Sequence, residues 1–431
     1  MDENISYDFS IQNLGKCMIP SPVNVSYFTP DSKRILFNIY LHRYDHLRGP
    51  DGFPLSVEVA GPREKIFFDP SKTKAAIVTC GGLCPGLNDV IRAIVLSLYH
   101  HYGVRRVLGF RYGYEGLVKK YGHAPLELTP EVVSDFHEQG GTKLGSSRGP
   151  QDISEMVDTL EELEIDLLFT LGGDGTLRGA QGIAEEVGRR GGRQTGVIGI
   201  PKTIDNDISY IQTSFGFATA VSEASEVIYA AHAEAEGARN GIGLVKLMGR
   251  QSGFIAAFAT LANSDVNFCL VPEVRFTLDG FLRALEKRLE LRRHAVVVVA
   301  EGAGQDLLKA SAGRDASGNI KFGDIGLFLR DRINDYFRNA GVEVSLKYID
   351  PSYTIRSMPA APYDSAFCLM LGHNAVHAGM AGRTSMVVGH WRAEFTHVPI
   401  AAAVSRRKQI DPQGKLWTGV ISATGQAREL V

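Results

Sequence analysis

Residues 166–207 read DLLFTLGGDGTLRGAQGIAEEVGRRGGRQTGVIGIPKTIDND. The apolar run from Leu167 to Leu171 has the length of one buried strand, and GGDGT follows it where a helix should begin. The helical pattern extends to about Arg190, and the residues from Val197 to Ile200 predict the next short strand. A strand, a helix and a second strand in this order are typical of a mainly parallel sheet with helices on its faces.

Both strands of this stretch end in loops that suit phosphate chemistry. Glycines let the backbone approach an anion, and the free N–H groups at the start of a helix face it. Asp174 adds a carboxylate, which is tolerable beside phosphates mainly when a divalent cation lies between them. The second strand is followed by Lys202, Thr203, Asp205 and Asp207. Two such loops favour transfer of a phosphoryl group to an alcohol.

The composition is that of a globular enzyme. The chain has 431 residues, of which 44% are hydrophobic and 22% charged, and this length predicts two α/β domains. A net charge of −2 favours neither nucleic acid nor an anionic membrane, and no apolar run approaches the ~20 residues of a membrane span. Five scattered cysteines and a polar, acidic N-terminus predict a cytoplasmic protein with reduced thiols.

The rest of the chain extends the same pattern. Residues 1–70 show no sustained periodicity and predict an N-terminal arm or small subdomain, in which Ile35–Tyr40 and Ile66–Phe68 are candidate strands. From Lys74 onward strands alternate with helices, whereas 351–356 reads as a loop. The strands include a continuous apolar run over 295–300 and a late strand over 384–389. We therefore expect an α/β fold of two interleaved three-layer domains with mainly parallel sheets, preceded by the arm.

Seven segments, in this order, resemble the phosphofructokinase family, over roughly residues 74–390. They are Thr79–Asn88 (TCGGLCPGLN), Gly141–Gly149 (GTKLGSSRG), Gly172–Thr176 (GGDGT), Pro201–Asp207 (PKTIDND), Leu247–Gly253 (LMGRQSG), Glu301–Gly302 and Asp350–Arg356 (DPSYTIR). GGDGT alone is not specific, because NAD kinases and lipid kinases use a similar turn. The combination of all seven is specific.

The resemblance implies the domain division and the ligand sites. Residues 71–214 plus about 363–393 would bind the phosphoryl donor, and 215–362 plus about 394–431 would bind the sugar phosphate and include the C-terminal tail. The donor site would comprise Gly82, Arg148, Gly149, Gly173, Asp174, Gly175 and Thr176, with Asp174 holding Mg²⁺. The fructose 6-phosphate site would comprise Thr203, Ile204, Asp205, Met248, Gly249, Arg250, Glu301, Tyr353, Thr354, Ile355 and Arg356.

The same resemblance implies catalytic roles. Asp205 would take the proton from the sugar 1-hydroxyl, and an ordinary carboxylate pKa near ~4 suffices because the alcohol need not ionise early. Arg148, Arg250 and the metal would neutralise charge on the moving phosphoryl group, and Thr203 would assist. Asp207 would orient Thr203 or its loop.

Gly175 and Lys202 bear on the donor. Lys202 in PKTIDND resembles the pyrophosphate-type lineage, whose pyrophosphate users typically have Asp where Gly175 stands. An aspartate there would repel the α-phosphate of ATP, whereas glycine leaves room for it. The chain thus resembles the ATP-using branch, and we expect an ATP-dependent 6-phosphofructokinase of glycolysis that is an allosteric homotetramer, as in the family.

Several alternatives remain open. The same reaction with pyrophosphate is favoured by Lys202 and opposed by Gly175, and a different sugar phosphate is compatible with the sequence. More distant alternatives are an NAD kinase and a regulatory subunit without turnover. The structural alternatives are an Asx turn for Asp205 and Asp207, a capping role for Glu301 and a polar surface turn for 141–149.

Overall fold

The computed structural model describes residues 8–40, 48, 52–308, 313 and 321–431. The chain forms two compact units. Unit 1 lies within Met1–Thr203, Ile208–Phe215 and Met358–Arg406, and unit 2 within Ile204–Asp207, Gly216–Ser357 and Arg407–Val431. The chain therefore passes from one unit to the other inside the PKTIDND motif.

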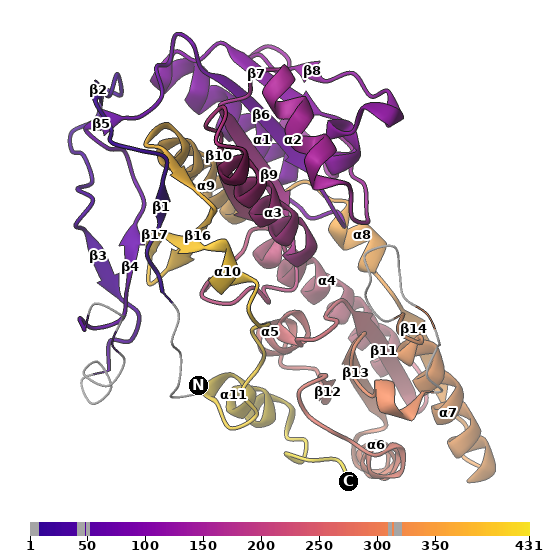
Figure 1. Ribbon diagram of the computed structural model, residues 1–431. Helices are drawn as coiled ribbons and strands as arrows, with labels where there is room; N and C mark the ends of the chain where they lie inside the picture. The colour runs from indigo at the N-terminus through magenta and orange to yellow at the C-terminus, as the bar shows by residue number, and fades with distance from the viewer. Residues whose placement is uncertain (1–7, 41–47, 49–51, 309–312, 314–320) are drawn as a thin grey trace. The chain divides into compact units, whose positions relative to one another are not determined.

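Unit 1 is built on a nine-stranded sheet (Figure 1). Its strands, in spatial order, are β3 (Arg34–Leu36), β4 (Ser56–Val59), β17 (Glu394–Pro399), β16 (Met386–Trp391), β10 (Gly196–Pro201), β9 (Leu167–Gly172), β6 (Lys74–Thr79), β7 (Arg106–Phe110) and β8 (Leu126–Glu127). The five strands from β16 to β7 pair in parallel, and those beyond them at both edges pair antiparallel. The predicted mainly parallel sheet is confirmed at its centre.

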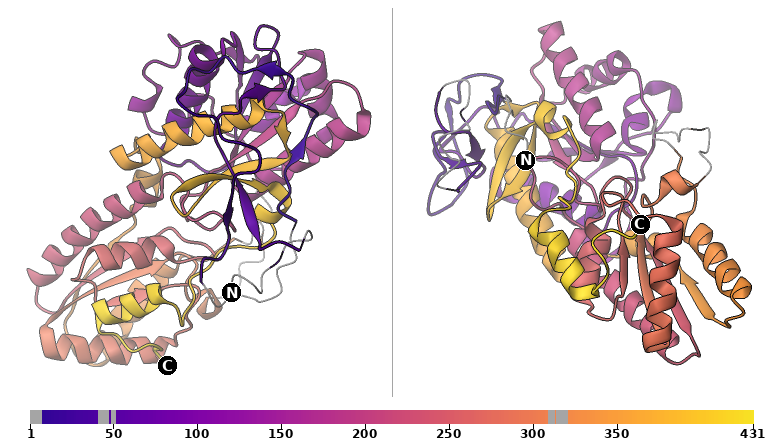
Figure 2. Two further views of the ribbon diagram at one scale, coloured as in Figure 1. Left: turned by 90° about the vertical axis from the view of Figure 1, so that its left-hand side faces the viewer. Right: turned by 90° about the horizontal axis from the view of Figure 1, so that it is seen from below.

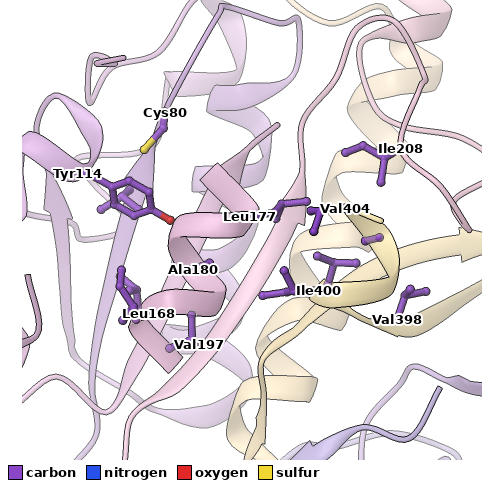
Figure 3. Packing of buried hydrophobic residues seen from close by; sticks show 14 of the residues in the cluster. Cys80, Tyr114, Leu168, Leu177, Ala180, Val197, Ile208, Val398, Ile400 and Val404 are labelled. Atoms are coloured by element: carbon purple, nitrogen blue, oxygen red, sulfur yellow. The ribbon is translucent and has the colours of Figure 1, made fainter. Parts of the chain in front are cut away.

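Helices cover both faces of this sheet because its central strands are apolar on both sides. Leu168 of β9 packs with Leu177 and Ala180 in one buried cluster (Figure 3). Its neighbour Leu167 faces the other way, since a Cβ on Gly379 would lie 3.1 Å from its Cδ2 atom. The helices concerned are α1 (Leu87–Leu96), extended by a π-helical turn (Ser97–Tyr102), α2 (Ile153–Glu162), α3 (Asp174–Arg190), α9 (Pro362–Met380) and α10 (Ile400–Ala403).

The N-terminal arm joins the sheet of unit 1. Strands β3 and β4 extend that sheet, while β1 (Gln12–Asn13) pairs with β15 (Arg383–Thr384) and β2 (Ile19–Pro20) with β5 (Lys65–Ile66). Figure 2 shows this indigo segment beside the yellow strands β16 and β17. The two predicted strands of the arm are shorter than expected, because only Ile35–Leu36 and Ile66 lie within strands.

A cluster of buried charged residues around Glu58 attaches the N-terminal arm to the rest of unit 1. The Glu58 carboxylate on β4 accepts hydrogen bonds from Arg63 (2.9 Å), Arg383 (3.1 Å) and His397 (2.9 Å). Burial acts to raise the pKa of Glu58, but the His397 hydrogen bond and the two guanidinium charges outweigh it and lower that pKa to about 2. Since β4, β15 and β17 each supply a partner, this cluster connects the arm to the C-terminal strands of unit 1.

Unit 2 is built on four parallel strands. They are β12 (Phe268–Leu270), β13 (His294–Ala300), β11 (Gly241–Leu247) and β14 (Ser345–Ile349), in spatial order. One buried cluster joins alternate residues of β11 and β13 to α4 (Phe217–Glu236), α5 (Phe254–Ala262) and α11 (Lys415–Thr424). The other alternate residues pack against α6 (Leu278–Arg292) and α7 (Ile325–Asn339). Unit 2 is therefore also a three-layer α/β unit.

Two local predictions were wrong. Residues 351–356 form the short helix α8 (Ser352–Arg356) rather than a loop, because Asp350 Oδ1 accepts hydrogen bonds from Ser352 N (3.1 Å) and Ser352 Oγ (2.5 Å) at its start. The strand predicted over 384–389 is interrupted at Ser385, whose φ of 55° separates β15 from β16. No helix in the described part of the chain has the length and apolarity that crossing a membrane requires.

Candidate active site

The predicted loops of unit 1 follow strands β6, β9 and β10 at their carboxyl ends. Those strands are parallel neighbours, so their carboxyl ends lie at one edge of the sheet, where open α/β sheets bind ligands. The loops are 79–88, 172–176 and 201–203. Sequence periodicity was enough to predict this arrangement.

Glycine is required on one side of the GGDGT turn and leaves space on the other. A side chain at Gly172 would overlap Thr176, whereas a Cβ on Gly175 would have no atom within 4 Å. Helix α3 begins at Asp174 behind Gly173, which has no side chain to cap it. The positive helix end and open backbone therefore form a corner suited to an anion. Tyr114 fixes this corner by donating its hydroxyl to Thr176 O at 2.6 Å.

The loop 141–149 packs against the loop 79–88. Thr79 Oγ1 donates to Gly145 O (2.7 Å) and Ser146 Oγ to Gly81 O (2.6 Å), while Gly81 N donates to Ser147 O (3.0 Å). Arg148 thereby lies near Gly82, where a Cβ would be 3.7 Å from its Nη2 atom. These bonds argue against a simple surface turn at 141–149, because the loop is fixed at the edge of the sheet.

Lys202 connects the loops of the donor corner. Its Nζ atom donates to Gly82 O at 2.5 Å, and its backbone N–H donates to Gly172 O at 2.9 Å. The residue is buried. At the end of unit 1, Thr203 O accepts a hydrogen bond of 2.6 Å from Ser214 Oγ. Lys202 thus lies beside Gly82, which the family resemblance predicts to be a donor-site residue.

Asp174 is the carboxylate at this corner. Its side chain is 27% exposed and lies 3.3 Å from Arg178 Nε one turn later on α3. Among the described residues, no three His, Cys, Asp or Glu side chains gather closely enough to hold a metal ion by themselves. One carboxylate completed by phosphate oxygens is nevertheless a common way to hold Mg²⁺. The residues present therefore fit a metal that arrives with a phosphate ligand.

Unit 2 carries the predicted acceptor loop with Asp205. The Asp205 carboxylate accepts a hydrogen bond from the backbone N–H of Arg250, and its Oδ1 atom is buried with no partner among the described residues. Burial and the carboxylates of Asp207 and Glu301 raise the pKa of Asp205 to about 7, against the opposing charge of Arg407. The expected ordinary pKa is therefore wrong, because the fold buries Asp205 beside the carboxylates of Asp207 and Glu301.

Asp207 is held by the C-terminal segment. Its Oδ2 atom accepts a hydrogen bond of 2.5 Å from Arg407 Nη1, and its backbone carbonyl accepts one of 2.7 Å from Lys408 N. The sequence analysis missed Arg407 and Lys408. The only available signal was the basic run RRK at 406–408, which on its own would be read as a solvated surface.

The loops after β11 and β13 interlock. Glu301 N donates to Leu247 O and Gly302 N to Gly249 O, both at 2.9 Å. A side chain on Gly302 would overlap the carbonyl of Arg250. Burial raises the pKa of Glu301, although the charges of Arg250 and Arg356 oppose the shift. Glu301 therefore shares its surroundings with two guanidinium groups.

Not every predicted sugar-site side chain can touch a ligand. Met248 and Ile355 are buried in the core beneath α4 and α5, so only their backbones are available. Tyr353 is 77% exposed, and the guanidinium carbon of Arg356 lies 4.8 Å from the centre of its ring. Thr354 lies between them on α8.

Lys246 on β11 fixes the start of α8 through an ion pair with Asp350. Its Nζ atom bonds Asp350 Oδ2 (2.8 Å), next to the start of α8, and Asp324 Oδ2 (2.9 Å) at the start of α7. Its side chain is only 12% exposed, and burial acts to lower its pKa while the two carboxylates outweigh this and raise it. This residue was not predicted, because its partners lie far away in sequence.

Comparison with known proteins decides the family. Residues 74–379 match the family model described as Phosphofructokinase. The chain belongs to the phosphofructokinase family.

Full-length relatives extend this result. An ATP-dependent 6-phosphofructokinase of Borreliella burgdorferi is 47% identical over 441 residues, which cover 98% of both chains. One of Entamoeba histolytica is 49% identical over 84% of this chain and 83% of the relative. Among solved structures, a pyrophosphate-dependent phosphofructokinase of Marinobacter aquaeolei matches 82% of this chain and 91% of its own, with a TM-score of 0.68 and 18% identity. That likeness concerns the phosphofructokinase fold.

Proposed function

We propose that this chain is an ATP-dependent 6-phosphofructokinase. It transfers the γ-phosphoryl group of ATP to the 1-hydroxyl of fructose 6-phosphate and releases fructose 1,6-bisphosphate and ADP, a step of glycolysis. The observation that carries the proposal is Asp205, whose buried Oδ1 atom lacks a partner among the described residues and whose carboxylate lies beside Arg250. The similarity of nearly the whole chain to ATP-dependent 6-phosphofructokinases supports the same reaction.

Asp205 is the proposed general base. The sugar oxygen O1 forms its bond to the γ-phosphorus as the bond between that phosphorus and the leaving ADP oxygen breaks, and the hydroxyl proton passes to Asp205. Because burial and Asp207 raise the pKa of Asp205 to about 7, it accepts a proton more readily than an ordinary carboxylate. Arg148 and Arg250 are proposed to neutralise the charge of the transferred group, and Thr203 to assist on the acceptor side.

Asp174 is the proposed magnesium ligand. Asp174 would hold Mg²⁺, which when bound would supply positive charge to offset that of the phosphates. This chain contributes the carboxylate and the N–H groups of the first turn of α3.

Each unit has its own proposed ligand. We propose that unit 1 binds the donor, through Gly82, Arg148, Gly149 and Gly173–Thr176, and that unit 2 binds the sugar phosphate, through Ile204, Asp205, Met248–Arg250, Glu301 and Tyr353–Arg356. We also propose a cytoplasmic, allosteric homotetramer, as the family resemblance implies. Size-exclusion chromatography with light scattering tests the subunit number.

The identity of the phosphoryl donor is tested by running the same assay once with ATP and once with pyrophosphate. Steady-state rates of fructose 1,6-bisphosphate formation with ATP and with pyrophosphate should favour ATP, because Gly175 leaves open space beside the first turn of α3. Lys202 favours the pyrophosphate alternative, and faster turnover with pyrophosphate would replace our proposal with it. Formation of NADP from NAD would favour an NAD kinase, and absence of any turnover would favour a regulatory subunit.

A further inference from the structure

The segment 407–410, here called the C-terminal strap, lies across two loops of unit 2 that carry proposed acceptor residues. Arg407 and Lys408 bond Asp207 beside Asp205, as described above. Gln409 Nε2 then donates to Gln251 O at 2.9 Å, next to Arg250. The strap therefore contacts both the loop that carries Asp205 and the loop that carries Arg250.

The half-buried carboxylate of Glu273 fixes the far end of the strap. Glu273 Oε1 accepts hydrogen bonds from Ile410 N (2.9 Å) and Gly253 N (3.0 Å), and its Oε2 atom lies 3.1 Å from the same Gly253 N. The Nζ atom of Lys408 lies 5.3 Å from the centre of the Phe254 ring. The strap is thus held by specific hydrogen bonds rather than by loose surface contact.

The charges of the acceptor loop require a counter-charge. Among the described residues of unit 2, the charges that act most strongly on Asp205 include those of Asp207, Glu301 and Arg407, and the charge of Asp207 also acts on Lys408. Two of the three groups facing Asp205 are carboxylates, which repel its charged form. Arg407 is the cation that opposes them through a direct bond to Asp207.

We propose that the C-terminal strap is a positioning element of the acceptor site, in which Arg407 holds Asp207 and balances the negative charge around Asp205. This inference rests on the proposed function. Arg407 is a positioning residue, since it acts on Asp205 through Asp207 and through its charge.

The test is the pH dependence of kcat/KM for fructose 6-phosphate in the full chain. Arg407→Gln should move the acid limb upward by about one pH unit, because removal of the cation raises the pKa of Asp205. The rate should then fall about fivefold at pH 7, where the deprotonated fraction drops from about one-half to about one-tenth, and change little at pH 9. Arg407→Lys keeps the charge and should leave the limb near its original position.

Two further variants separate charge from folding. Asp207→Asn should move the acid limb downward, and the double variant with Arg407→Gln should return it toward the original position. Arg428→Gln removes an equal charge from an exposed arginine that bonds Pro412 O, and it should match the unmodified chain. Thermal melting of each variant reports any loss of folding.

Three outcomes overturn the inference while leaving the proposed function intact: an unmoved acid limb in Arg407→Gln, an equal loss of rate at every pH, or the same shift in Arg407→Lys. If the unmodified chain itself fails to phosphorylate fructose 6-phosphate, the proposed function fails and the inference fails with it.

Discussion

Replacing Gly175 by aspartate tests the donor assignment most directly. A Cβ at this position meets no atom within 4 Å, so the variant requires no rearrangement of its neighbours. An acidic side chain in the first turn of α3 also interacts favourably with the positive end of the helix dipole, and Asp has a higher helix propensity than Gly. Folding should therefore be preserved, and any change in activity should reflect the ligand.

The expected loss follows from charge repulsion. Two unit charges about 5 Å apart repel by about 3 kcal/mol at an effective dielectric constant of about 20. If the α-phosphate of ATP lies beside Gly175, kcat/KM for ATP should fall about 100-fold. The value for pyrophosphate, which lacks that phosphate group, should fall much less. The coupled assay with each donor in turn gives both values.

Two control variants sharpen the result. Gly188→Asp adds the same charge to the last turns of the same helix, where a Cβ also has no neighbour within 4 Å, and it should retain the activity of the unmodified chain. Gly175→Ala adds bulk without charge and should cost little. Undiminished use of ATP by Gly175→Asp would refute the reasoning, and an equal loss in Gly175→Ala would assign the effect to space rather than charge.

Three further predictions concern other residues. Asp205→Asn should lower kcat by orders of magnitude with little change in KM. In the unmodified chain, kcat/KM should fall as the pH drops below about 7, where Asp205 becomes protonated. Near-normal turnover of the variant would show that Asp205 is not the general base. Lys246→Met should raise KM for fructose 6-phosphate about tenfold by releasing α8, and unaltered KM would contradict this. Glu58→Gln should lower the free energy of unfolding at pH 7 by about 3 kcal/mol, because it removes the buried carboxylate that pairs with Arg63 and Arg383 and leaves them only the exposed carboxylate of Asp31. Since the pKa of Glu58 is depressed to about 2, its contribution to stability is present above pH ~4.5 and is lost as the pH falls toward 2. Equal free energies of chemical unfolding for Glu58→Gln and the unmodified chain at pH 7 would contradict this prediction.

The parallel core could be predicted because its signals are local. Continuous apolar runs such as 167–171 and 295–300 gave strands β9 and β13, and glycine-rich segments marked their ends. The donor loops could be placed at one sheet edge for the same reason. The helix α8 could not be predicted, because the hydrogen bonds from Ser352 to Asp350 at its start depend on the position of Asp350, which Lys246 holds from another strand.

The acceptor site was only partly predictable. Motifs identified Asp205, Arg250 and Glu301, but their electrostatics depend on which charges the fold brings together. The raised pKa of Asp205 depends largely on burial and on Glu301, which the motif does not reveal, and Arg407 was marked only by the basic run 406–408. The division of ligands between the units and the residues assigned to each ligand stay predictions until binding is measured.

The acceptor loop breaks a general rule of stable proteins, and this argues for its function. Carboxylates are normally kept apart or paired when buried, yet Asp205 faces Asp207 and Glu301. A fold that needed only stability would lose little by placing amides at these positions. The chain instead retains the repulsion and offsets part of it with Arg407, Lys408 and the N–H of Arg250. Such a local conflict, held in place by surrounding hydrogen bonds, is expected where a carboxylate must accept a proton near neutral pH.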